Sequence, residues 1–239
     1  MFVQFTEYYV QSFALLVPAI ALGLIAYHAQ KAQFTLGRML VTVSFAGLLF
    51  GVWFAAASAL SLAGILMPPA TFTDPPFALM PILIGGPLIW FLGRKTAIGN
   101  ALFNQASHSS LIAIQMLRVM GFIFLVGWLT GDIPWQFALP AGLGDIWAGL
   151  AGISAYRAVQ QNSPDARKKL VRANVIGLLD FVVAVGTGVL TTEGFAHIWS
   201  LDAPNIINSY PMALFPAFFV PIFLGFHLLS LSKLRAEKI

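Results

Sequence analysis

The stretch from Gln115 to Asp145 reads QMLRVMGFIFLVGWLTGDIPWQFALPAGLGD, and it places Arg118 and Asp145 inside long apolar runs. A third charge, Asp180, lies in the apolar sequence NVIGLLDFVVAV at residues 174–185. An ionisable side chain near the centre of a bilayer costs at least about 2.5–3.5 kcal/mol on insertion scales. Such groups are tolerated where they pair with each other or face a polar cavity. These three residues therefore mark the candidate site.

The composition indicates that lipid is the solvent of this chain. Of its 239 residues, 59% are hydrophobic and 9% are charged, whereas soluble domains carry about 25% charged residues. The length of the apolar segments, each near the roughly 20 residues that a helix needs to cross hydrocarbon, and their lack of period-two alternation predict helices. The predicted fold is an all-α membrane protein, a seven-transmembrane helical bundle with helices at about 8–28, 38–64, 76–93, 109–131, 136–157, 168–191 and 210–232.

The charges between the helices predict the orientation, with the N-terminus outside and the C-terminus in the cytoplasm. In that orientation every Lys and Arg except Arg118 falls at a cytoplasmic loop or helix end: Lys31, Arg38, Arg94, Lys95, Arg157, Arg167, Lys168, Lys169, Arg172, Lys233, Arg235 and Lys238. The net charge of +4 then reflects the positive-inside rule and no nucleic-acid partner is expected. The expected partners are the lipid bilayer and a small-molecule solute or a proton, and the expected location is a bacterial inner (plasma) membrane.

The chain also aligns with itself in three places that follow one another in order. Residues 19–29 match 148–158, residues 38–52 match 168–182, and residues 76–81 match 211–216, each by shared small or apolar residues. These matches predict a single transmembrane domain over 1–239 with a parallel 3+1+3 internal repeat: repeat A at about 8–93, a linker helix at about 109–131 and repeat B at about 136–232.

This layout resembles, in topology alone, that of SWEET-type sugar carriers and PQ-loop transporters. The sequence has no Pro-Gln dipeptide, so the resemblance assigns no residue a role. It implies a carrier whose site lies between two bundles near the middle of the membrane.

The three charges are predicted to lie at similar depths in the membrane. At about 1.5 Å per residue, Arg118 and Asp145 lie roughly 14 Å, and Asp180 roughly 18 Å, from the nearer ends of their predicted helices. Two carboxylates facing one guanidinium leave a carboxylate that needs a proton or a ligand. The predicted substrate- or proton-binding set, in a polar and partly hydrated pocket, is Arg118, Asp145, Asp180, Gln115, Asn174 and His227.

These features favour a transporter or permease for a small polar solute, coupled to protons, with no catalytic residues and no cofactor. One alternative is a redox or haem- or metal-binding membrane subunit that uses the cytoplasmic-side histidines His28, His108 and His227. Another is a structural or sensor seven-helix subunit, in which the Arg–Asp pairs only fix helix packing.

Overall fold

Helices make up all the regular secondary structure over residues 2–237, the part of the chain that the computed structural model describes. The prediction of an all-α fold is therefore confirmed. The elements are α1 (Phe2–Lys31), α2 (Leu36–Leu62), α3 (Met80–Lys95), α4 (Ala97–Gln105), α5 (His108–Ala113), the 3₁₀ helix η1 (Ile114–Gly121), α6 (Phe122–Leu129), α7 (Trp135–Gln160), α8 (Ala166–Thr191), the π-helix η2 (Phe215–Phe219) and α9 (Val220–Ala236).

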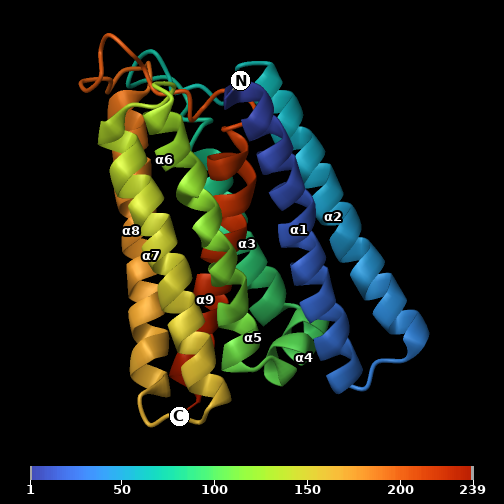
Figure 1. Ribbon diagram of the computed structural model, residues 1–239. Coiled ribbons are helices and arrows are strands. Elements are labelled where there is room, and N and C mark those ends of the chain that lie inside the picture. Colours follow the sequence, from blue (N-terminus) through green and yellow to red (C-terminus); the bar gives the residue numbers. More distant parts are fainter. Residues whose placement is uncertain (1, 238–239) are drawn as a thin grey trace.

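The long helices stand side by side as a bundle with the two ends of the chain at opposite ends (Figure 1). The N-terminal end of the bundle carries the start of α1 and the long loops 63–79 and 192–214. The C-terminal end carries α4, the turn between α1 and α2, and the end of α9. The pair α7–α8 forms one side, the pair α1–α2 the other, and α9 runs between them with α3 beside it (Figure 1).

Six helical stretches are long and apolar enough to cross a membrane, which indicates an integral membrane protein. They are Gln4–Lys31, Leu36–Leu62, His108–Leu129, Trp135–Gln160, Ala166–Thr191 and Phe215–Ala236. Large apolar side chains also cover the outside of the bundle. On α2, for example, Leu40, Val41 and Leu48 are each more than half exposed, as expected of a surface that faces lipid tails.

The third predicted span is shorter in the structure than in the sequence-based prediction. Residues 77–79 form turns after Pro75 and Pro76, and α3 begins only at Met80 and is 16 residues long. Proline lacks the backbone N–H and disfavours helix in the residue before it, although Pro81 fits the first turn of α3. A further helix that we did not predict, α4, follows α3 and begins where the Thr96 hydroxyl accepts a hydrogen bond from the Gly99 N–H at 3.0 Å.

The predicted linker helix at 109–131 is divided into α5, η1 and α6. The eight residues of η1 have 3₁₀ geometry, in which side chains at i and i+3 lie directly above one another. Gln115 and Arg118 therefore project from the same side of η1.

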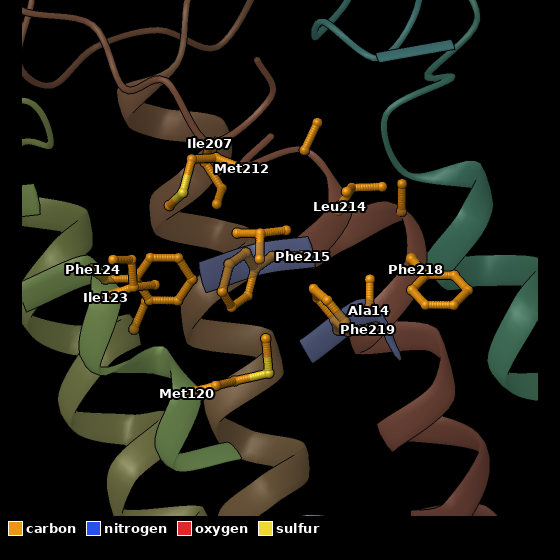
Figure 2. Close-up of a cluster of buried hydrophobic side chains, with 14 of the residues drawn as sticks. Ala14, Met120, Ile123, Phe124, Ile207, Met212, Leu214, Phe215, Phe218 and Phe219 are labelled. Carbon is orange, nitrogen blue, oxygen red and sulfur yellow. The ribbon is translucent and has the colours of Figure 1, made fainter. Parts of the chain in front are cut away.

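An aromatic core joins η1, α6 and the π-helical turn η2 (Figure 2). The rings of Phe124 and Phe215 pack with their centroids 4.6 Å apart, and Phe218 and Phe219 extend the cluster. Two hydrogen bonds attach the outer helices to this core. The Tyr9 hydroxyl of α1 donates to the Met120 carbonyl at 2.9 Å, and the Trp53 indole of α2 donates to the Ala217 carbonyl at 2.9 Å.

A polar contact ties α9 to α5 and α8 at the C-terminal end of the bundle. Glu237 accepts a hydrogen bond from Lys233 Nζ at 2.7 Å, and its other carboxylate oxygen lies 3.2 Å from His108 Nε2. Arg167 of α8 donates to the Leu234 carbonyl at 3.0 Å. The hydrogen bond from Lys233 lowers the pKa of Glu237.

Replacing Glu237 by Gln should therefore destabilise the protein by about 0–1 kcal/mol near neutral pH, since half of the Glu237 side chain is exposed. A carboxyl group with a lowered pKa in the folded state stabilises that state above its unfolded pKa, and the effect disappears as pH falls through the folded pKa. Thermal unfolding of the two proteins across pH tests this: their midpoints should converge as pH falls below the ordinary pKa of a Glu side chain, about 4.3. A difference that persists or grows in acid would contradict it.

Candidate functional site

The guanidinium of Arg118 lies at the centre of the site, and its side chain is fully buried. Arg118 Nε donates to Asp145 Oδ1 of α7 at 2.8 Å, and Nη2 forms an ion pair with Asp180 Oδ2 of α8. Nη1 donates to the Gly177 carbonyl at 2.9 Å, and the ring of Phe181 lies 3.9 Å from the guanidinium carbon. The structure therefore brings together the three charges that the sequence singles out.

A hydrogen-bonded chain continues from Arg118 into α9. The Asn174 amide nitrogen donates to the Leu170 carbonyl at 2.8 Å and to Ser230 Oγ at 3.0 Å, so the Asn174 oxygen is the acceptor for His227 Nδ1 at 2.9 Å. His227 then carries its proton on Nδ1, and its Nε2 faces Arg118 Nη1 at 3.4 Å as an acceptor. The chain holds the guanidinium from the side opposite the two carboxylates.

Gln115 lies close to Arg118 but makes a different contact. Its amide nitrogen donates to the Phe223 carbonyl at 3.0 Å, one turn before His227 on α9. Gln115 thus attaches η1 to α9 and has no direct hydrogen bond to Arg118 among residues 2–237. The other five predicted residues form one connected network, so the predicted set does gather at the junction of η1, α7, α8 and α9.

Three glycines allow the helices to approach this closely. A Cβ atom at Gly144 of α7 would overlap Asp180 Oδ1, and one at Gly121 of η1 would overlap the Asp145 carboxylate. A Cβ at Gly177 of α8 would overlap the His227 ring and would lie 2.7 Å from Arg118 Nη1. The ionic contacts depend on glycine at all three positions.

A cavity of about 150 Å³ leads from the loops at the N-terminal end of the bundle down to Asp145 and Asp180. These two are the only charged residues among the described residues that line it. The walls differ from the polar, partly hydrated pocket that the sequence led us to expect. They are mostly apolar because α8 presents a stripe of small and apolar side chains and the loops contribute prolines, with rings from Phe124, Phe137, Phe181, Phe195 and Phe215.

The charges at the floor of the cavity do not balance. One guanidinium faces two carboxyl groups. The Asp180 side chain is only 5% exposed, and its Oδ1 has no hydrogen-bond partner among residues 2–237. One negative charge and one acceptor atom are therefore left for a proton or a ligand.

A family model with the description "Domain of unknown function (DUF8737)" matches residues 76–235. The chain belongs to this family. No curated protein and no solved structure matches the chain. The part matched to DUF8737 starts just before α3 and runs into the last turn of α9, so it contains all six predicted site residues, whereas α1 and α2 lie outside it.

The three histidines predicted as alternative haem or metal ligands each have different neighbours. His227, in the DUF8737 part of the chain, is bound to Asn174 and Arg118, while His108 lies at Glu237 and the His28 ring packs against Tyr27. Among residues 2–237 there is no group of three or more His, Cys, Asp or Glu that could hold a metal ion. Within residues 2–237 the three histidines therefore do not form one common ligand set.

Sequence reasoning missed several residues that complete the site within DUF8737. Ser230 follows His227 by three residues on the same face of α9, a spacing that could have indicated it. The face of Phe181, next to Asp180, and the carbonyl of Gly177 also bind the guanidinium. No pattern in the sequence marks a carbonyl as a ligand.

Proposed function

We propose that this protein is an integral-membrane transporter of a small solute, in which binding of a proton at Asp145 and Asp180 is coupled to solute movement. The observation that carries the proposal is the floor of the cavity, where two buried carboxyl groups share one guanidinium. Two carboxylates at one site do not both ionise easily, and the unbalanced charge is relieved by a proton or a bound cation. An intramembrane charge of this kind is characteristic of proton and substrate pathways.

The proposal includes seven membrane crossings, with the N-terminus outside, the C-terminus in the cytoplasm and the 3+1+3 repeat. The chain ends lie at opposite ends of the bundle (Figure 1), where an odd number of crossings would place them, and this supports α3 as a short seventh span beside the six longer ones. Its 16 residues extend about 24 Å, and a bilayer adapts to a short span by local thinning. The proposed membrane is a bacterial inner membrane.

The charge distribution supports this orientation. Lys31, Arg94, Arg157, Arg167 and Arg235 lie at helix ends on the C-terminal end of the bundle, as the positive-inside rule requires of a cytoplasmic face. Lys238 lies outside the described residues. In this orientation the cavity opens toward the outer side, and the Asn174–His227 chain closes the inner side of the site.

Two irregular helices support a change of access at this site. Arg118 is held by the 3₁₀ helix η1, and the cavity wall includes Phe215 and Pro216 of the π-helix η2. Such irregular turns within helices are often found at functional hinges. Neutralising a carboxyl group would weaken its attraction to Arg118 and so release η1 from α7 and α8.

Replacing Asp180 by Asn should abolish solute-driven proton movement while leaving the protein folded, since Asn keeps the size of the side chain but cannot bind the transported proton. The protein is reconstituted into vesicles that contain a pH-sensitive dye, and a panel of sugars, amino acids and small amines is added outside. At least one solute should change the internal pH with the unmodified protein. The matched control is Asp202→Asn, which changes an exposed loop carboxylate at the N-terminal end.

The buried pairs would also suit a purely structural subunit, because the Arg118 donors already have protein partners. The same experiment separates the two functions. The absence of solute-driven proton movement with the unmodified protein would remove the proposed transport role and leave the structural one. Equal proton movement by the unmodified protein and a folded Asp180→Asn variant would remove Asp180 as the residue that binds the proton.

A further inference from the structure

The cavity above Asp145 and Asp180 combines an aromatic wall with an unpaired acceptor. Phe124 and Phe215, whose rings lie side by side in Figure 2, form part of the wall with Phe137 and Phe181. Asp180 lines the floor, its side chain is 95% buried, and its Oδ1 has no partner among residues 2–237. A ligand in this cavity would meet apolar side chains along its length and the carboxyl groups of Asp145 and Asp180 at one end.

The volume limits the size of the ligand. The cavity measures about 150 Å³, and an apolar cavity of about this size holds one benzene molecule. The apolar part of the ligand is therefore about as large as a single benzene ring.

The charge at the floor sets the chemistry of the ligand's polar end. Asp145 and Asp180 together exceed the charge of Arg118 by one negative charge. The faces of Phe rings also attract cations. A protonated amine supplies both the hydrogen-bond donors and the missing positive charge, whereas a carboxylate would add a second unbalanced negative charge.

We infer that the cavity binds a protonated primary amine attached to an apolar body of about one ring, with the ammonium group at the carboxyl groups of Asp145 and Asp180. This inference rests on the proposed function in one respect, which is that the amine is the transported solute. It narrows the small polar solute expected from the sequence to an amphiphilic organic cation.

The same floor can hold the ammonium group or an added proton, but not both. The ionisable groups around it are Asp145 of α7, Asp180 of α8, Arg118 of η1, His227 of α9 and Tyr9 of α1. Only the two carboxyl groups line the cavity, since His227 lies at Arg118 Nη1 and the Tyr9 hydroxyl donates to the Met120 carbonyl. Binding of the ammonium ion to the protonated site therefore releases one proton from the carboxyl pair.

Titration calorimetry on the purified full chain in lipid nanodiscs tests the inference, with benzylamine, benzyl alcohol and benzoate as probes. Benzylamine, which is protonated near neutral pH, should bind about tenfold or more tightly than the alcohol, because its hydrogen bond to a carboxylate is charge-assisted. Benzoate should not bind. Repeating the titration in buffers of different ionisation enthalpy should show release of a proton, and binding should weaken as pH falls.

Three variants locate the bound amine. Asp180→Asn should lose about tenfold or more in affinity. Ala184→Phe, which fills the cavity at a lining position without changing its charge, should abolish binding. Gly186→Ala on the same helix should bind normally, because Gly186 has no neighbour within 4 Å and does not line the cavity.

Equal affinities for benzylamine and benzyl alcohol, or normal binding by Ala184→Phe, would overturn the inference. The comparison of probes on the unmodified protein decides the matter even where Asp180→Asn fails to fold. Amine binding without solute-driven proton movement would remove the transport role and keep the site. Proton movement driven by another solute, without amine binding, would keep the transport role and remove this ligand class.

Discussion

Replacing Arg118 by Gln is expected to cost about 3–5 kcal/mol of folding free energy, more than any other single substitution in the site. The guanidinium is fully buried and is the shared partner of Asp145 and Asp180. Its removal leaves two carboxylates without a cation, together with an unpaired carbonyl at Gly177. Thermal unfolding of the purified protein in detergent measures the loss.

The matched control is Arg38→Gln, which changes an exposed arginine at the C-terminal end of the bundle and should alter stability by no more than about 0.5 kcal/mol. Combining Arg118→Gln with Asp180→Asn should cost less than the sum of the two single changes, because the second removes a charge that the first has stranded. If Arg118→Gln proves as stable as Arg38→Gln, the ionic contacts contribute nothing to the fold.

Replacing Gly177 by Ala is expected to cost about 1–3 kcal/mol or more, the next largest effect. The added methyl group would overlap the His227 ring and approach Arg118 Nη1. Neither group can move freely, since His227 is bound to Asn174 and Arg118 to both carboxylates. The variant should therefore unfold at a lower temperature and, because the site is displaced, should also lose solute-driven proton movement.

Gly186→Ala gives the matched comparison on the same helix. No atom lies within 4 Å of a Cβ at Gly186, and alanine is favoured over glycine inside a helix by about 0.5–1 kcal/mol. This variant should be as stable as the unmodified protein or slightly more so. Equal behaviour of the two alanine variants would show that α8 can separate from α9 without cost.

The charged centre could be predicted from the sequence because isolated charges in apolar runs are costly and must be compensated. That argument selects Arg118, Asp145 and Asp180 without knowledge of the fold. It gives depth along each helix but not rotation about the helix axis, so their meeting was visible only in the structure. The apolar walls of the cavity were missed for the same reason, since they come from several helices and the loops between them.

The irregular helices η1 and η2 could not be predicted from the sequence either. The runs that contain η1 and η2 read as continuous apolar helix, because propensity does not separate α, 3₁₀ and π geometry over such short stretches. The early start predicted for the third span had a different cause. Pro75 and Pro76 precede an apolar run, but the residues that follow them form turns before α3 begins. A count of apolar residues takes no account of the backbone N–H groups that prolines lack.

The spacing of the ion pairs along the chain has a consequence for how the protein is made. Arg118 is synthesised 27 residues before Asp145 and 62 residues before Asp180. The helical segment that carries Arg118 therefore enters the bilayer before either carboxylate is available, or stays at the membrane surface until then. Entering the bilayer with an unpaired Arg118 costs at least about 2.5 kcal/mol. Asp145 of α7 supplies the first opposite charge and Asp180 of α8 the second. We therefore expect the insertion of these three segments to be cooperative.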